Sequence, residues 1–186
     1  LFGCGVVTGV GAVINTANAR EEDSVAIVGL GGVGLSALLA SIAIGSKRTI
    51  AIDLSDEKLA LARELGADHT LNPKDENFLE TFLDITSGGA NIAVETAGSG
   101  HALKTAYDIT RRGGTTVAAG MPGPKVEITL SHLSIAAEER VIKGSYMGSC
   151  IAQRDIPKYL DMFQTGKLPV DRLLSRKIKF ENLNEA

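Results

Sequence analysis

The stretch 25–53 constrains the fold of this chain more than any other, because it places a strand, a turn, a helix and a second strand in a recognisable order. An apolar run leads into the glycine-rich turn 29–34 (GLGGVG), a helical segment follows over 35–45, and a second apolar run over 49–52 ends on Asp53. The turn has the spacing G-x-G-x-x-G, with an acidic residue about 20 positions further along. This order predicts a βαβ unit, in which a helix crosses over between two parallel strands.

The glycine-rich turn and Asp53 together predict a dinucleotide site. Glycines in such a turn permit the tight bend, the close approach of backbone to a pyrophosphate, and close packing of helix on strand. The helix that follows offers free N–H groups and a partial positive charge to the pyrophosphate. A carboxylate at the end of the second strand can accept both hydroxyl hydrogens of an adenosine ribose. FAD sites and methyltransferases also place an acid here, and Asp53 taken alone could be a solvated strand-end carboxylate.

Asp53 also bears on the choice between the two nicotinamide dinucleotides. Its negative charge would lie where the 2′-phosphate of NADP sits, and the following residues 54–57 (LSDE) include no arginine that could compensate. The sequence therefore predicts NAD rather than NADP.

Strands and helices alternate along the rest of the chain, which predicts a single α/β domain with a doubly wound parallel sheet, the Rossmann fold. His69, His101 and His132 are isolated and are expected at helix starts or on the surface. Strands are expected over 24–28, 49–52, 69–71, 92–94, 116–119 and 141–147, with an antiparallel or edge strand over 126–130. Helices are expected over 35–45, 56–65, 77–87, 101–110, 131–138 and 156–164.

Composition excludes several classes of protein. With 186 residues, 44% apolar residues and a net charge of −3, the chain is an ordinary globular domain without the basic block of a nucleic-acid-binding protein. Two cysteines far apart argue against a disulfide framework and for the reducing cytoplasm. The uncharged stretch 25–45 is long enough for a membrane span, but its clustered glycines fit a strand-to-helix turn better, so no membrane partner is expected.

The residues before the first strand point to a particular family of dinucleotide proteins. Residues 3–9 (GCGVVTG) resemble the corresponding segment of zinc-dependent alcohol dehydrogenases, which belong to the medium-chain dehydrogenase family. The resemblance covers nearly the whole chain, through the glycine turn and then 64–68 (ELGAD), 72–75 (NPKD), 95–98 (ETAG), 143–148 (KGSYMG) and 182–185 (NLNE).

The resemblance implies NAD as cofactor and assigns roles to individual residues. Cys4 matches the third protein ligand of the catalytic zinc, from a set of two cysteines and one histidine. Asp53 and Lys58 match the pair that binds the adenosine ribose, and Leu54 matches a residue that lines the adenine slot. The remaining implied cofactor contacts are those of the pyrophosphate turn and the nicotinamide: Thr8, Gly29, Gly31, Gly32, Val33, Gly34, Ala119, Met121, Ser145 and Met147.

In this family the other zinc ligands, the proton relay and most of the substrate pocket lie in a separate catalytic domain. None of the family's catalytic residues other than the zinc ligand Cys4 has a counterpart in this chain, and both ends look cut. We therefore expect a lead-in segment and helix over 1–20, an NAD-binding domain over 21–170, and over 171–186 the start of a return to an absent catalytic domain. The chain alone is expected to bind NAD, to hold no zinc, and not to catalyse.

Three readings of function follow. In the leading one, the parent protein transfers hydride between an alcohol/aldehyde pair and NAD, with zinc acting on the substrate oxygen. A zinc-free quinone or enoyl reductase of the same superfamily is an alternative, although Cys4 and Asp53 count against it. A nucleotide-binding module without catalysis is the third reading.

The resemblance also implies a homodimer. Family members pair one edge strand of this domain across a two-fold axis, and the matching segment is 125–130 (KVEITL). Its apolar residues Val126, Ile128 and Leu130 alternate with polar ones, as an edge strand requires. An apolar edge left unpaired promotes aggregation, whereas a symmetric partner would pair it.

Overall fold

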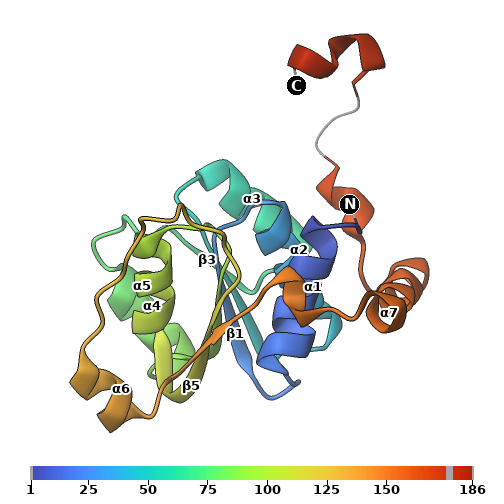
Figure 1. Cartoon of the computed structure of the whole chain (residues 1–186). Coiled ribbons are helices and arrows are strands. Elements are labelled where there is room, and N and C mark those ends of the chain that lie inside the picture. The colour runs from blue at the N-terminus through green and yellow to red at the C-terminus, as the bar shows by residue number, and fades with distance from the viewer. Residues whose placement is uncertain (1, 175–177, 186) are drawn as a thin grey trace.

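Parallel strands form the centre of the molecule, which we describe from a computed structural model covering residues 2–174 and 178–185 (Figure 1). The sheet has six strands in the order β3-β2-β1-β4-β5-β6, and every neighbouring pair is parallel. Chain order reverses between β1 and β4, which is the mark of a doubly wound sheet and confirms the predicted fold class. The strands are β1 (Ser24–Val28), β2 (Arg48–Ile52), β3 (His69–Leu71), β4 (Ala90–Glu95), β5 (Thr110–Ala118) and β6 (Val141–Gly144).

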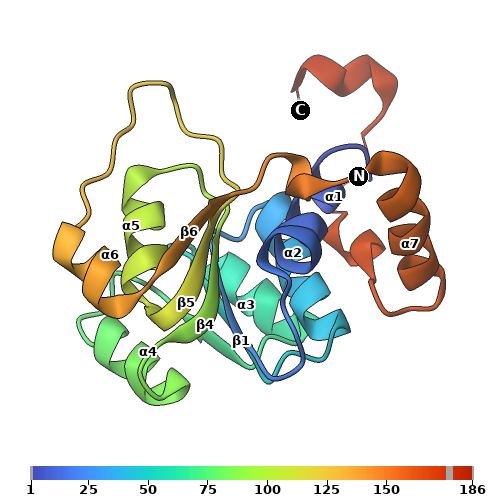
Figure 2. The same cartoon turned by 60° about the horizontal axis from the view of Figure 1, so that its bottom comes forward.

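Helices cover both faces of this sheet, as Figure 2 shows: α4, α5 and α6 lie to one side, and α1, α2 and α7 lie to the other. The α-helices are α1 (Gly5–Gly11), α2 (Gly32–Ala43), α3 (Asp56–Leu65), α4 (Phe78–Thr86), α5 (Gly100–Asp108), α6 (His132–Glu138) and α7 (Ala152–Gln164). A π-helix η1 (Ala12–Ala17) continues α1, and 3-10 turns follow at η2 (Met147–Ser149), η3 (Val170–Leu173) and η4 (Phe180–Glu185).

The core is split by the sheet into two apolar layers. Successive side chains of a strand point to opposite faces, so Val25 and Ile27 pack with helices α1 and α2. Ala26 and Val28 face the other way and pack with Phe82 of α4. Because both faces are covered at the centre of the sheet, β1 is buried over its whole length rather than alternating.

Residues 5–17 belong to this core although they precede the first strand. Val6, Val7 and Val10 are almost completely buried. Gly9 lies so close to α2 that a Cβ there would overlap the carbonyl oxygen of Val33. Gly9 therefore allows α1 to pack tightly against the first turns of α2.

The structure corrects five of the predicted elements. The segment 126–130 forms no strand in the described chain, because its alternating pattern has no neighbouring strand to pair with here. The helix expected over 101–110 ends at Asp108, and β5 begins directly at Thr110, with a register shift before its regular part. The last helix starts at Ala152 rather than 156, and β6 ends at Gly144 rather than 147.

Within residues 2–174 and 178–185, every helix is too short or too polar to cross a lipid bilayer. His101 and His132 lie in the first turns of α5 and α6, which confirms the prediction that these histidines lie at helix starts.

Candidate functional site

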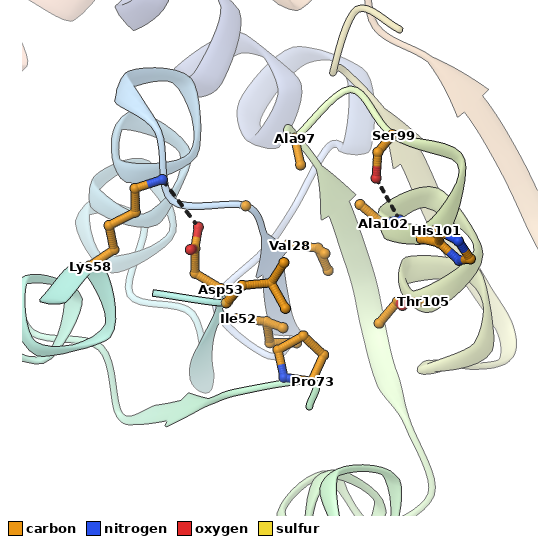
Figure 3. Close-up of a pocket in the computed structure, with 12 residues that line it drawn as sticks. Val28, Ile52, Asp53, Lys58, Pro73, Ala97, Ser99, His101, Ala102 and Thr105 are labelled. Carbon is orange, nitrogen blue, oxygen red and sulfur yellow. Dashed lines mark hydrogen bonds and ion pairs between the residues drawn. The ribbon is translucent and has the colours of Figure 1, made fainter. Parts of the chain in front are cut away.

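A cavity of about 420 Å³ opens at the carboxyl ends of β1 and β2, beside the point where the strand order reverses (Figure 3). In doubly wound folds, ligands bind at this reversal point because the connections on either side diverge to opposite faces and leave a crevice. The walls come from the ends of β1 and β2, from α3, from the segment after β3 and from α5. They consist of Val28, Gly29, Ile52, Asp53, Leu54, Lys58, Pro73, Ala97, Ser99, His101, Ala102 and Thr105.

Asp53 is held firmly at the mouth of this cavity. One carboxylate oxygen, Oδ2, accepts a hydrogen bond of 2.6 Å from the N–H of Leu30, and Oδ1 accepts one of 2.9 Å from the N–H of Ser55. Lys58 Nζ lies 3.7 Å from Oδ2, and Figure 3 shows the pair side by side on one wall of the cavity. The structure thus brings together Asp53, Leu54 and Lys58, the residues expected around the adenosine.

The glycine turn has the shape that a pyrophosphate site needs. Gly29 has φ +96°, a left-handed conformation that favours glycine, and a Cβ there would clash with Ala97. A Cβ on Gly34 would overlap the carbonyl oxygen of Gly29, so this glycine allows the helix to pack on the strand. A Cβ on Gly31 or Gly32, in contrast, would meet nothing within 4 Å. The space over these two residues is where backbone and ligand can approach.

Helix α2 begins at Gly32, directly over that space. The first N–H groups of a helix have no partner within it, and the N-cap residue Gly31 has no side chain to accept from them. These amides and the helix dipole favour an anion. The residues present therefore fit a dinucleotide, with adenosine in the cavity and pyrophosphate over Gly31 and Gly32.

The expected nicotinamide contacts gather along the carboxyl edge beyond β4. Ser145 follows β6, and its N–H donates to the carbonyl of Ala118 at the end of β5 (2.8 Å). Thr8 of α1 lies across from Met147, with Oγ1 3.9 Å from the methionine sulfur. Ala119 and Met121 lie just after β5, and Met121 is 74% exposed. Val33 lies in the first turn of α2.

Glu95 is a buried carboxylate at the end of β4, only 2% exposed. Its Oε1 accepts a hydrogen bond of 2.5 Å from the N–H of Gly98. Burial raises the pKa of Glu95, and hydrogen bonds from the backbone of Gly98, Ala97, Ser99 and Gly120 offset part of that rise. The carboxylate therefore ties together the two loops that follow β4 and β5, both on the side of the crevice away from β2.

Cys4 is exposed and lies at the N-cap of α1. It shares a hollow of about 370 Å³ with Gly32 and Ser36 of α2, so the predicted zinc ligand and the pyrophosphate turn are neighbours. Among residues 2–174 and 178–185, no group of three or more His, Cys, Asp and Glu side chains could hold a metal ion. A tetrahedral zinc site needs four ligands, so Cys4 could supply one of them.

Several lining residues were missed by sequence reasoning. Pro73, Ala97, Ser99 and His101 come from connections after β3 and β4, far from the glycine turn in the sequence. Their position after a predicted strand is one signal that could have found them, because the carboxyl ends of parallel strands meet at one edge of the sheet. Pro73 and Ala97 also lie in the family-like segments 72–75 and 95–98.

Comparison with known proteins agrees with this geometry. The family model for zinc-binding dehydrogenases matches residues 32–165. The chain belongs to the zinc-binding dehydrogenase family. Its resemblance to alcohol dehydrogenases, first inferred from residues 3–9, is thereby confirmed.

The similar proteins described below include alcohol dehydrogenases, and their match extends over the full length of this chain. A geraniol dehydrogenase from Castellaniella defragrans is 38% identical and is covered over 50% of its own length. An alcohol dehydrogenase class-2 isozyme from Oryctolagus cuniculus is 34% identical, with 49% of it covered. The crystal structure of a benzyl alcohol dehydrogenase from Acinetobacter calcoaceticus, 34% identical, superimposes with a TM-score of 0.94 over 99% of this chain and 51% of that one. The chain thus spans about half the length of the relatives it matches.

Proposed function

We propose that this chain is the NAD-binding domain of a zinc-dependent alcohol dehydrogenase. The observation that carries the proposal is the crevice in which Asp53, fixed by the N–H groups of Leu30 and Ser55, stands beside a glycine turn with open space above Gly31. Adenosine ribose would bind Asp53 and Lys58, and the pyrophosphate would lie against the first amides of α2.

We infer that the cofactor is NAD rather than NADP. The carboxylate of Asp53 would repel a 2′-phosphate, and among the residues that line the cavity Lys58 is the only lysine or arginine. That lysine is already paired with Asp53 and so does not form a phosphate site of its own.

The reaction proposed for the whole protein is hydride transfer between an alcohol/aldehyde pair and the cofactor. When bound, zinc would act as a Lewis acid on the substrate oxygen and make the alkoxide accessible near neutral pH. Within this chain, Cys4 would be one zinc ligand, and its place beside the start of α2 supports a metal close to the nicotinamide half of the site. Thr8, Val33, Ser145 and Met147 would orient the nicotinamide ring. An exposed cysteine at this position disfavours a zinc-free reductase.

The test uses a full-length protein that contains this chain together with the remaining zinc ligands. Zinc-dependent alcohol oxidation with NAD, lost on chelation and restored by zinc, is the expected result. Activity on quinones or enoyl substrates with no zinc bound would favour the reductase reading, and cofactor binding without any turnover would favour a non-catalytic module.

Three further expectations belong to this proposal. We propose a homodimer formed through 125–130, in which a partner copy would supply the strand neighbour that a single copy lacks. The division into a lead-in over 1–20, a cofactor domain over 21–170 and a return segment over 171–186 stays a prediction, and residues 175–177 and 186 of that last segment lie outside the described residues. The cytoplasm stays the predicted compartment.

A further inference from the structure

The turn after β6 has a strained backbone. Met147 has φ +49°, Gly148 φ +65° and Ser149 φ +49°, so three consecutive residues are left-handed and two of them are not glycine. Side chains other than glycine rarely adopt this conformation, and it persists only where the surrounding structure enforces it. Such strain is concentrated at functional sites.

Two side chains of the π-helix η1 enforce the turn. Thr16 Oγ1 lies 2.8 Å from the hydroxyl oxygens of both Ser145, which precedes the turn, and Ser149, its last residue. Asn15 Nδ2 donates to the carbonyl of Gly148 at 3.2 Å. The π-helix is itself a departure from α-helical geometry, of a kind found mostly at functional sites.

This pair of side chains is anchored from behind. Asn15 Nδ2 also lies 3.2 Å from Asp155 Oδ2 and 3.0 Å from the hydroxyl of Tyr159, both on α7 and both buried. On the backbone side, a Cβ on Gly11 would overlap the carbonyl oxygen of Gly148, so helix and turn are in direct contact. The turn is therefore held by η1, and Asn15 of η1 is in turn held by α7.

The turn lies on the half of the crevice away from Asp53. The strand order reverses between β1 and β4, Asp53 ends β2 on one side, and the turn follows β6 on the other. A dinucleotide whose adenosine binds at Asp53 must extend its other half across the ends of β4, β5 and β6. Met147 then faces Thr8, and Ser145 stands at the end of β6.

We propose that Asn15 and Thr16 are positioning residues for the nicotinamide half of the cofactor, acting by holding the turn 146–149 in its left-handed shape. The inference rests on the proposed function, since it assumes that a dinucleotide occupies the crevice. Neither residue touches the cofactor; each acts through Ser145, Met147 and the backbone between them.

Calorimetry on this chain with NADH and with ADP-ribose, which lacks the nicotinamide, separates the two halves of the site. Thr16→Val keeps the shape of the side chain but removes both hydroxyl contacts, and Thr16→Ser keeps them. Thr16→Val should lower the affinity for NADH roughly fivefold, because ordinary hydrogen bonds are lost. The affinity for ADP-ribose should change by less than about twofold. Thr16→Ser should restore NADH affinity. The fluorescence emission of bound NADH reports the surroundings of the dihydronicotinamide. It should therefore change in Thr16→Val and stay as in the wild type in Thr16→Ser.

Ser149→Ala removes one hydroxyl partner of Thr16 at an exposed position, and it replaces Thr16→Val as the test if that variant does not fold. We expect the same selective loss of NADH affinity. An unchanged NADH affinity would overturn the inference. If Thr16→Val lowers the affinities for NADH and ADP-ribose equally, the contacts of Asn15 and Thr16 support the domain in general, and the inference is wrong. Wild type that binds neither ligand would instead overturn the proposed function and this inference with it.

Discussion

The carboxylate of Asp53 faces two ways: it fixes the glycine turn through Leu30 and it stands at the mouth of the cavity. The place of Asp53 beside a dinucleotide site could be predicted from the sequence, because the motif is short and its parts are neighbours in the chain. The hydrogen bond from Leu30 could not, because it depends on how closely the ends of β1 and β2 approach each other.

Replacing Asp53 by Asn should weaken NADH binding by roughly 1.5–3 kcal/mol, the typical worth of hydrogen bonds to a charged group. The loss of negative charge should also narrow the gap between NADH and NADPH. Asp56→Asn is a matched control, since Asp56 is an exposed acid in the first turn of α3 that does not line the cavity. Calorimetry in which both variants weaken NADH equally would contradict the assigned role of Asp53.

Two glycines of the turn should respond in opposite ways to alanine. Gly31 has φ −75° and open space around its missing Cβ, so Gly31→Ala should leave the melting temperature nearly unchanged. Gly31→Ala should lower the affinity for NADH about tenfold or more, because the methyl group would meet the pyrophosphate. A tenfold loss corresponds to about 1.4 kcal/mol of binding free energy. Gly34→Ala should instead destabilise the fold by about 1–3 kcal/mol through overlap with Gly29. Thermal melts and NADH titrations of both variants make the comparison, and a collapse of Gly31→Ala would mean that this glycine serves the backbone.

At the scale of elements, sequence patterns located most of the helices and strands but not their environment. The helix over Asp56–Leu65 is predicted to the residue, because leucine spacing and the following Gly66 mark it locally. The bounds of the strand over His69–Leu71 are also predicted to the residue. The segment 126–130 has the alternation of a strand, yet a strand also needs a partner to pair with. The π-helix η1 could not be predicted, since its shape depends on contacts with Gly148 and α7 more than 130 positions away.

The pairing of Asp155 with Arg154, in the first turn of α7, should make stability depend on acidic pH. Hydrogen bonding to Arg154, with further help from the N–H of Ile151, lowers the pKa of Asp155 to about 2. A carboxyl whose pKa is lower in the folded state stabilises the fold above its unfolded value of 3.8, and this stability is lost as the pH falls toward 2. Asp155→Asn should be less stable than wild type at pH 6, and the difference should shrink between pH values of about 4 and 2. Urea unfolding of both proteins across this range measures it; a difference that stays constant would contradict the assignment.

At the scale of the whole molecule, the proposed dimer depends on the segment 125–130. Sedimentation at tens of micromolar should show a dimer of the wild type, and Ile128→Pro should shift it toward monomer because proline removes a donor from the strand ladder. Ile128→Val retains the amide and a β-branched side chain and should stay dimeric. A monomeric wild type would contradict the proposal.

The chain should also be catalytically silent. With one cysteine beside the cofactor turn and no cluster of metal ligands among residues 2–174 and 178–185, it should bind NADH yet show no zinc-dependent alcohol oxidation. Turnover accompanied by stoichiometric zinc would show that the chain holds a complete metal site after all.

The central claim is that the crevice beside Asp53 binds NAD and discriminates against NADP. Calorimetric titration of the wild-type chain with NADH and with NADPH tests it most directly. We expect one NADH per chain, bound more tightly than NADPH. Equal or reversed affinities, or no binding of either, would contradict the account.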